Sequence, residues 1–476
     1  HRAAFLLYNH PDLERSGVLV IGPSRAFLRY IAQVLPSLGE SSVVQTTIFD
    51  LVARSRIGAE DRPSAALVKG DIRMAAVIER ALAAQRQPLV DPVMLRARHL
   101  AATMDPDEVN GIAGSIASGP APYKAGRAAL RSRLVAACRG QLRASGRFEA
   151  DADWFAKELG GSRGFTDLLD RLWPSISPNQ LVNTLLTSEP LLRSAAGDIL
   201  GDEEIDDLLR PKATSLGQVR WSRDDLALLD EANFLINGRT RCYGHIICDE
   251  VQDLSPMQLR MLARRATNGS MTVLGDIAQA TGAQTYASWD EVIPYLPRSP
   301  QVRSEELTLG YRAPAQILDF ASQLLPSSAP SVRPTSSVRR GRFSPELRRV
   351  DDNLLEAESL AVAHRLASEG FLVGVILPEG PLNRRVEAFT RHDSRVGRIE
   401  RHGITRRVTL VPAPAAKGLE FDAVVVVEPA KIAGSDRRGL RLLYVALTRP
   451  IHHLVVVHSS PLPDLLATSG GAGPRR

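Results

Sequence analysis

The chain has 476 residues, too many for one ordinary domain and enough to bury several hydrophobic cores. Its net charge of +6 permits a nucleic-acid partner but does not require one, because acidic and basic residues are interspersed. The spacing of its three cysteines does not suggest a disulfide framework or a zinc site, and no apolar run approaches membrane-spanning length. We therefore expect a cytoplasmic protein without membrane contact.

The first fifty residues predict a strand–helix–strand unit of a parallel sheet. Residues 1–8 have the pattern of an amphipathic helix, and an apolar strand at 17–21 follows. Gly22, Pro23 and Ser24 end that strand and introduce a helix that closes near Pro36, and a second strand is expected at 43–48. Because His1 is not preceded by methionine, we expect the chain to begin inside a longer protein.

Residues 51–213 differ from the regions around them and predict a mainly helical insertion. Alanine, leucine and arginine dominate, and strand-like runs nearly vanish. The insertion carries an acidic run at 201–207, and such a run is most simply a solvated helix face or loop.

Two strands after the insertion end in polar residues that suit nucleotide chemistry. The strand at 244–248 leads into Asp249 and Glu250, and the strand at 271–274 leads into the segment that ends at Gln279. Asp249 can hold Mg²⁺ through its water shell, Glu250 can polarise an attacking water, and Gln279 can sense a γ-phosphate.

The last third of the chain predicts a second α/β region. A segment rich in Ser, Pro and Arg at 325–345 is expected to be a linker or loop, and the tail from 459 is expected to fray. The expected strands lie near 371–377, 406–411 and 423–427, and the expected helices around 353–369 and 436–448.

Three further segments extend this set. They read Leu-Gly-Tyr-Arg-Ala-Pro at 309–314, Lys-Gly-Leu-Glu-Phe-Asp at 417–422 and Leu-Tyr-Val-Ala-Leu-Thr-Arg-Pro at 443–450. With the carboxylate pair, and in this order, they resemble the motifs of superfamily 1 helicases of the UvrD/Rep-like group. The resemblance implies an α/β protein with two RecA-like parallel-sheet domains of the P-loop NTPase fold and ATP bound between them.

The resemblance also implies domain bounds and residue roles. Residues 1–50 and 214–300 would form the first RecA-like domain, 51–213 its helical insertion and 301–476 the second RecA-like domain. Taken singly, an arginine is usually a surface residue, Tyr311 could pack half-buried and Glu420 could cap a turn. The implied roles are Mg²⁺ for Asp249, the attacking water for Glu250, γ-phosphate sensing for Gln279, arginine fingers for Arg312 and Arg449, adenine stacking for Tyr311, ribose binding for Glu420, and ATP binding for Gly418 and Asp276.

Two departures from DNA-translocating members redirect the expected function. The segment before Lys417 carries Pro412 and Pro414 where those members have a threonine and a histidine that touch the nucleic-acid strand. The segment 280–285 lacks the aromatic residues that stack on bases. Both departures resemble the HelD branch, which implies binding to bacterial RNA polymerase and its release from nucleic acid. The acidic run could then mimic nucleic acid, a hypothesis that rests on charge alone.

The chain contains no Gly-x-x-x-x-Gly-Lys-[Ser/Thr] phosphate loop, and the N-terminal coiled coil of HelD-like proteins is also missing. In the family the loop lies just upstream of a helix like 1–8, so we expect it before His1 and expect this chain alone to be inactive. Two alternatives stay open, a UvrD/Rep-type 3′–5′ DNA helicase or translocase and a non-catalytic pseudo-ATPase binding module.

Overall fold

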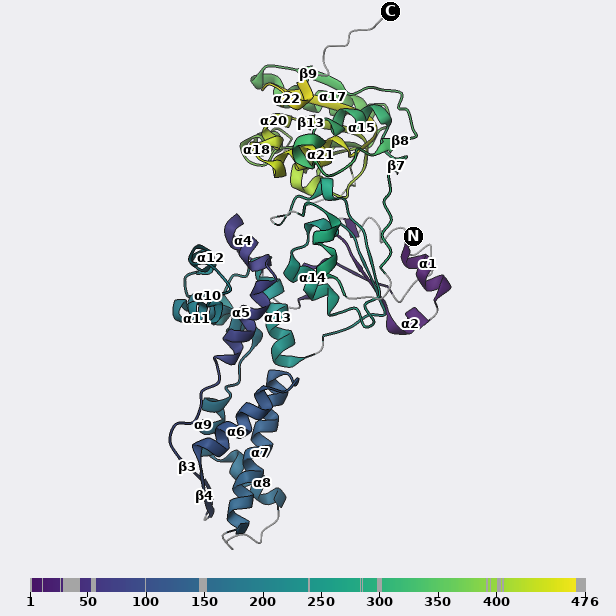
Figure 1. Cartoon of the computed structure of the whole chain (residues 1–476). Helices are drawn as coiled ribbons and strands as arrows, with labels where there is room; N and C mark the ends of the chain where they lie inside the picture. Colours follow the sequence, from purple (N-terminus) through teal and green to yellow (C-terminus); the bar gives the residue numbers. More distant parts are fainter. Residues whose placement is uncertain are drawn as a thin grey trace, which may run out of the picture. The chain divides into compact units, whose positions relative to one another are not determined.

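The computed structural model shows two compact units (Figure 1). We call them the α/β unit, which comprises His1–Leu51, Tyr243–Ser255 and Ala266–Arg476, and the helical unit, which comprises Val52–Cys242 and Pro256–Arg265. The structure describes residues 2–10, 12–25, 27–28, 43–52, 57–98, 100–144, 152–238, 240–282, 284, 286–297, 302–390, 393, 395–399, 404 and 406–467.

The first sheet of the α/β unit has four parallel strands in the order β2-β1-β5-β6. They are β1 (Val18–Ile21), β2 (Val43–Thr46), β5 (His245–Cys248) and β6 (Met271–Val273), and the helices α1 (Arg2–Asn9) and α2 (Asp12–Ser16) precede them. The four predicted strands are therefore confirmed. Ser24 Oγ accepts a hydrogen bond from Phe27 N–H at 3.1 Å, but the predicted helix from residue 29 onward lies outside the described residues.

The second sheet has six parallel strands in the order β11-β12-β10-β13-β14-β9. The strands predicted near 371–377, 406–411 and 423–427 are confirmed as β10, β12 and β13, whereas β9, β11 and β14 were not predicted. The six strands are β9 (Glu346–Arg349), β10 (Val373–Leu377), β11 (Val396–Arg398), β12 (Val408–Pro412), β13 (Phe421–Val427) and β14 (Pro450–His458).

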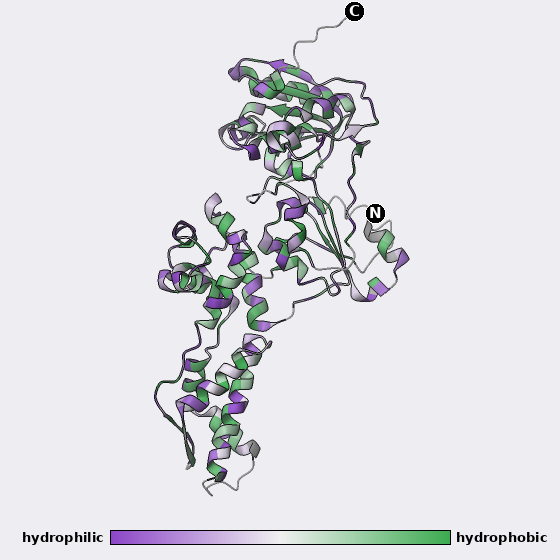
Figure 2. Ribbon diagram, viewed as in Figure 1, coloured by the Kyte–Doolittle hydropathy of each residue, from purple (hydrophilic) through white to green (hydrophobic). Residues whose placement is uncertain are grey.

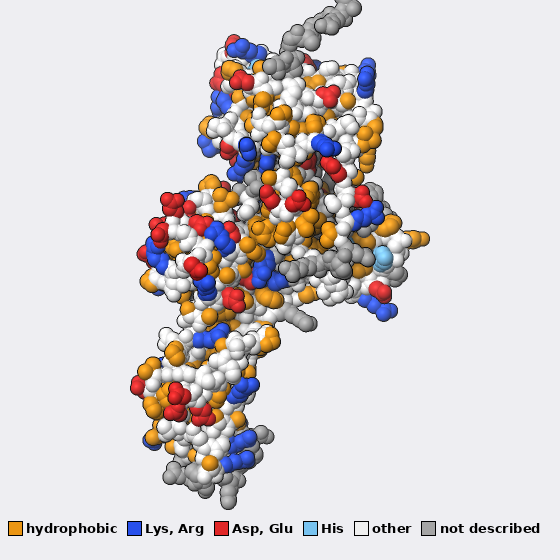
Figure 3. Space-filling view, viewed as in Figure 1, with side chains coloured by type: hydrophobic (Ala, Val, Ile, Leu, Met, Phe, Trp, Pro, Cys, Tyr) orange, Lys and Arg blue, Asp and Glu red, His pale blue; other side chains and the backbone are white. Residues whose placement is uncertain are grey.

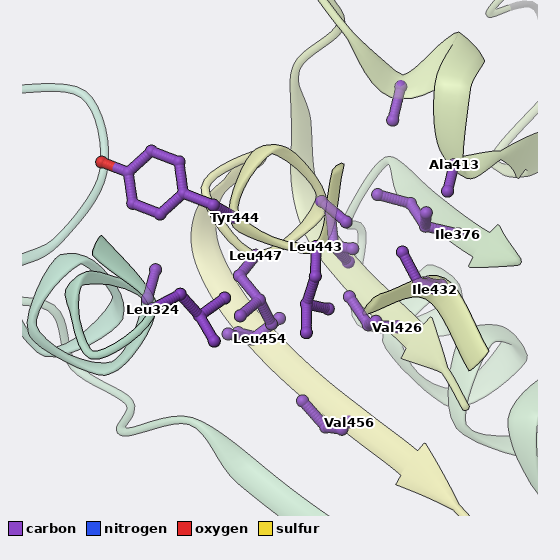
Figure 4. Packing of buried hydrophobic residues seen from close by; sticks show 14 of the residues in the cluster. Leu324, Ile376, Ala413, Val426, Ile432, Leu443, Tyr444, Leu447, Leu454 and Val456 are labelled. Atoms are coloured by element: carbon purple, nitrogen blue, oxygen red, sulfur yellow. The ribbon is translucent and has the colours of Figure 1, made fainter. Parts of the chain in front are cut away.

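Both faces of the second sheet are buried. Alternate residues of each strand point to opposite faces, and hydrophobic side chains pack on each face. Val424 and Val426 of β13 pack with α21 (Arg437–Leu447) on one face, as Figure 4 shows for Val426 beside Leu443. Val425 and Val427 pack on the other face in the cluster that contains Leu360 and Leu366 of α17 (Leu355–Ser368). Each fully buried aliphatic side chain contributes about 1.5–3 kcal/mol. The strands of both sheets are largely hydrophobic, as Figure 2 shows.

Shorter elements complete the α/β unit, and several lie where a linker was expected. Residues 325–345 contain α16 and β8, which pairs in parallel with β7, so this segment is more ordered than the sequence predicts. The remaining elements are β7 (Leu309–Gly310), β8 (Ser336–Ser337), α15 (Ala315–Ser322), α16 (Leu325–Ser328), α18 (Pro381–Phe389), α20 (Pro429–Ala433), α22 (Asp464–Ala467) and the 3₁₀ turns Phe49–Leu51, Val251–Asp253, Ile277–Gln279, Trp289–Glu291, Ile293–Tyr295, Asp352–Leu354 and Ala413–Ala416.

The helical unit is larger than the predicted insertion. It continues past residue 213 to Cys242 and includes 256–265, because α13 packs against α5, α10 and α14. An unpredicted antiparallel hairpin, β3–β4, lies against α7, α8 and α9. Its elements are α4 (Pro63–Gly70), α5 (Arg73–Ala83), β3 (Val93–Ala97), β4 (Leu100–Met104), α6 (Pro106–Ala117), α7 (Tyr123–Ala144), α8 (Ala152–Gly161), α9 (Arg163–Leu172), α10 (Pro178–Thr187), α11 (Glu189–Ala196), α12 (Asp202–Leu208), the 3₁₀ turn Leu216–Gln218, α13 (Asp225–Asn237) and α14 (Pro256–Ala263).

The acidic run forms α12, and arginines of the same unit pair with four of its five carboxylates. Arg193 contacts Asp202 at 2.8 Å and Asp206 at 2.9 Å. Arg73 contacts Glu204 at 2.6 Å, and Arg62 contacts Asp207 at 3.2 Å. Acidic and basic side chains are likewise intermixed on the face shown in Figure 3. Across the described residues, no helix has both the length and the apolar character needed to cross a membrane.

Candidate active site

The carboxylate pair lies where β5 ends, between β1 and β6 at the carboxyl edge of the first sheet. Asp249 continues the pairing by donating its N–H to Ile21 O at 3.0 Å. Glu250 then adopts the left-handed conformation, with φ 54° and ψ 39°, and starts the 3₁₀ turn Val251–Asp253. This conformation is uncommon for a residue with a Cβ and concentrates at functional sites. Adjacent carboxylates in different backbone conformations can therefore take different roles.

The Asp249 carboxylate suits a cation. Burial and the neighbouring Glu250 charge raise the pKa of its carboxyl, so a cation beside it would favour the ionised form. Among the described residues, it accepts a hydrogen bond from Glu250 N–H alone, at 2.9 Å. No group of three or more His, Cys, Asp or Glu among those residues could enclose a metal ion. Mg²⁺ is usually held by one or two carboxylates together with water and substrate phosphates, so Asp249 fits that ion.

The Gln252 amide orients the Glu250 carboxylate through a hydrogen bond. The side chain of Gln252 is fully buried, donates Nε2–H to Glu250 Oε2 at 2.6 Å and accepts Asp276 N–H on Oε1 at 3.1 Å. Gly275 makes room for it, because a Cβ at that position would collide with Gln252 Oε1. The segment after β5 and the segment after β6 are thus joined through the Gln252 amide.

Gln279 is held at both ends of its amide group. Its Nε2–H donates to Asp276 Oδ2 at 2.8 Å, and its Oε1 accepts from Arg449 Nη2 at 3.1 Å. Asp276 also caps the 3₁₀ turn by accepting Ala278 N–H at 2.9 Å. In this structure Asp276, expected among the ATP-binding residues, contacts protein groups and fixes the orientation of Gln279.

Arg449 and Lys417 bring the second sheet's side chains to the first sheet's edge. Arg449 follows α21 and also donates Nε–H to Val445 O at 3.0 Å, and burial lowers the pKa of its guanidinium. Lys417, which precedes β13, is 8% exposed. Its ammonium contacts Glu250 Oε2 at 3.2 Å and Asp253 Oδ2 at 2.6 Å. Arg449 and Gln279, which come from different sheets, therefore contact each other directly.

Arg312 contacts a different predicted residue. Its Nη1 lies 2.6 Å from Glu420 Oε1, while its side chain remains 66% exposed. Tyr311 is 78% exposed, so its ring face is open to a planar ligand. Gly418 has φ +74°, and a Cβ there would approach Phe27 at 3.3 Å. The structure thus groups Arg312 with Glu420, and Glu250 and Gln279 with Lys417 and Arg449.

Sequence reasoning missed Gln252, Asp253 and the side-chain role of Lys417. Asp253 Oδ1 accepts Thr281 N–H at 2.8 Å and Gly282 N–H at 3.1 Å, which fixes the loop after Gln279. The available signal was the Asp-Glu-Val-Gln-Asp spacing, because a 3₁₀ turn after a strand can turn Gln252 and Asp253 toward one loop.

The two departures noted in the sequence are visible in the structure. Pro412 ends β12, and the 3₁₀ turn Ala413–Ala416 carries no polar side chain. Tyr286, near the segment that lacks aromatics, is 3% exposed and donates its hydroxyl to Leu254 O at 2.8 Å. Its role is therefore packing.

Comparisons with known proteins agree with the helicase resemblance. Residues 411–457 match the family of UvrD-like helicase C-terminal domains. The ATP-dependent DNA helicase UvrD2 of Mycobacterium tuberculosis (strain H37Rv) and that of Mycobacterium bovis are each 27% identical over 202 residues, which is 42% of this chain. The match covers 26% of each relative, so the chain spans about a quarter of the curated proteins it matches.

Solved structures with similarity include the C-terminal domain of a possible DNA helicase from Lactobacillus plantarum WCFS1. It is 24% identical, with a TM-score of 0.28, and covers 34% of this chain and 95% of that domain. The PRRSV helicase is 17% identical, with a TM-score of 0.26, and covers 47% of this chain and 36% of that one. The sequence matches support a UvrD/Rep-like helicase core, and the two parallel sheets confirm the α/β class.

Proposed function

We propose that the α/β unit belongs to an ATP-hydrolysing motor of superfamily 1. The observation that carries the proposal is the pair of contacts from second-sheet residues, Lys417 to Glu250 and Arg449 to Gln279. Nucleotide hydrolysis gains most from positioned charges, and residues from two sheets that meet at one carboxylate edge can couple sheet movement to hydrolysis.

Each polar residue has a distinct task in this proposal. Glu250, held by Gln252, orients and deprotonates the attacking water. Gln279 and Arg449 read the γ-phosphate, and Arg312 adds positive charge beside Glu420, which contacts the ribose. Asp249 would hold Mg²⁺, which neutralises phosphate charge when bound. Tyr311 would stack on the adenine. Gly418 would let the backbone pass close to the Phe27 side chain, because it has no Cβ.

We further propose that the motor acts on bacterial RNA polymerase in the manner of HelD-like proteins. Pro412 and the apolar turn after it offer no side-chain donor to a nucleic-acid strand, and Tyr286 is occupied in packing. The acidic helix α12 is less available to mimic nucleic acid than its composition suggests, since three arginines of the same unit pair with four of its five carboxylates. A UvrD/Rep-type DNA helicase is the second candidate, favoured by the similarity to UvrD2.

One experiment separates these candidates. Purified full-length protein is assayed for ATP hydrolysis, for unwinding of a tailed DNA duplex and for binding to RNA polymerase core enzyme. Hydrolysis with polymerase binding and no unwinding supports the HelD-like proposal. Unwinding stimulated by single-stranded DNA, without polymerase binding, replaces it with the helicase. Nucleotide binding without any hydrolysis would leave the pseudo-ATPase module.

A further inference from the structure

We propose that Lys417 is a positioning residue that fixes the Glu250 carboxylate and ties its orientation to the second sheet. This inference rests on the ATPase function proposed above. Lys417 is buried, with 8% of its surface exposed. Its ion pairs are with Glu250 and Asp253, not with Tyr311 or Glu420, the residues assigned to the adenine and the ribose.

The Lys417 ammonium contacts three groups at the edge of the first sheet. Nζ donates hydrogen bonds to Asp253 Oδ2 at 2.6 Å and to Gln279 O at 2.7 Å, and it forms an ion pair with Glu250 Oε2 at 3.2 Å. A phosphate beside Nζ would compete with these contacts.

One oxygen of the Glu250 carboxylate, Oε2, already has protein partners. Both Gln252 Nε2 and Lys417 Nζ approach Oε2, at 2.6 Å and 3.2 Å. Oε1 is then the oxygen that remains for a water proton. A group that must accept a proton in one direction benefits from such fixed orientation, because misplacement of about 1 Å can cost about 10²-fold in rate.

Neighbouring cations hold the same loop but do not reach Glu250. Arg438 donates Nε–H to Thr281 O at 2.8 Å, and Arg441 donates Nη1–H to Ala280 O at 3.5 Å. Together with Arg449 on Gln279, they bind three successive residues of the first sheet's loop. Within the described residues, Lys417 alone of these four cations bonds both this loop and the Glu250 carboxylate. Lys417 therefore joins this loop to Glu250 from the second sheet, in addition to the Gln252 link within the first sheet.

The test compares Lys417→Met and Lys417→Arg in the full-length protein, with Lys431→Met as the matched control. Lys431 lies on α20, is 45% exposed and pairs with Glu428 at 3.3 Å, away from the Glu250 edge. We expect Lys417→Met to lower kcat about 10- to 100-fold with KM for ATP nearly unchanged. Lys417→Arg keeps the positive charge and can still pair with Glu250, so it should retain more of kcat than Lys417→Met.

A second measurement does not depend on turnover. Urea unfolding of Lys417→Met, Glu250→Gln and the double variant forms a double-mutant cycle, in which non-additive effects show that the two side chains interact. Additive effects, or a Lys417→Met enzyme with wild-type kcat, would overturn the inference. If the wild-type protein does not hydrolyse ATP, the proposed function fails, and a non-additive cycle would still support the contact itself.

Discussion

Each parallel sheet of the α/β unit places a left-handed glutamate directly after a central strand, and the two glutamates differ in what surrounds them. Glu250 follows β5 with φ 54°, and Glu428 follows β13 with φ 52°. Both lie at a carboxyl edge, where parallel α/β sheets bind ligands. One backbone device thus occurs twice in the same unit.

Glu428 is fully buried and accepts its hydrogen bonds on one carboxylate oxygen, while among the described residues Oε2 has only an ion pair with Lys431 at 3.3 Å. Its side chain is 0% exposed, and Oε1 accepts hydrogen bonds from Ser459 N–H, from Ser459 Oγ–H at 2.8 Å and from Ser460 N–H at 3.2 Å. Burial acts to raise the pKa of its carboxyl, but hydrogen bonds from Ser460 and Ser459 outweigh it and lower the pKa to about 2. Glu250 also accepts on one oxygen, but its side chain is 16% exposed, so Oε1 remains accessible to another partner. The difference teaches that burial makes a structural carboxylate of Glu428, whereas partial exposure leaves Glu250 able to meet a ligand.

The largest expected effect is the loss of turnover when Glu250 becomes glutamine. A glutamine cannot accept the water proton, so we expect kcat of the full-length protein to fall about 10²- to 10⁴-fold. Nucleotide binding should be retained, because Glu250 contacts protein groups on its Oε2 side. Steady-state hydrolysis and fluorescent-nucleotide binding measure the two quantities. Glu428→Gln should leave kcat per folded molecule unchanged, and equal losses for both variants would remove the distinction between the edges.

The second effect is on stability at the Glu428 edge. The folded-state pKa of about 2 lies below the ordinary value of 4.5, so the stabilisation is present above pH 4.5 and is lost as the pH falls toward 2. It amounts to about 3 kcal/mol. Glu428→Gln should lower the free energy of unfolding at pH 7 by about 2–3 kcal/mol and remove this acid dependence. Urea unfolding at several pH values checks it, with the exposed Glu379→Gln as control.

The third effect separates orientation from stability at the Glu250 edge. Gln252→Met removes the donor to Glu250 and the acceptor for Asp276 N–H, so we expect kcat to fall about 10- to 100-fold and stability to fall about 1–3 kcal/mol. Gln316→Met is the matched control, because Gln316 exchanges two hydrogen bonds with Gly341 elsewhere in the unit. It should lose comparable stability and keep kcat. If Gln252→Met retained wild-type kcat, Gln252 would be structural only.

Sequence reasoning succeeded where a feature is local. Apolar runs predicted β1, β5 and β13, because a buried parallel strand reads as a continuous run of Val, Ile and Leu. It missed β9, which reads Glu-Leu-Arg-Arg and lies at the sheet edge, where one side is unpaired and a polar sequence is tolerated. A short arginine-rich strand carries no apolar period to detect.

The same limit applies to the candidate site, where local motifs are visible in the sequence and long-range contacts are not. Asp249 and Glu250 are adjacent in sequence, so their motif is visible in one segment. The contact of Lys417 with Asp253 joins residues 164 positions apart, and its existence depends on how two sheets meet rather than on any local pattern. Gln252 was missed because its importance lies in a buried side-chain bond, which spacing alone does not reveal.

The smallest effect tests which donors hold Glu428 Oε1. Ser459→Ala removes one hydroxyl bond of 2.8 Å but leaves the N–H groups of Ser459 and Ser460 in place. We expect a loss of about 0.5–1.5 kcal/mol in the free energy of unfolding, the usual net contribution of one hydrogen bond. Urea unfolding at pH 7 measures it, and kcat should not change. A loss as large as that of Glu428→Gln would mean that the hydroxyl, not the backbone, holds the carboxylate. The binding of Glu428 Oε1 would then depend on one side chain rather than on the backbone of the segment after β14.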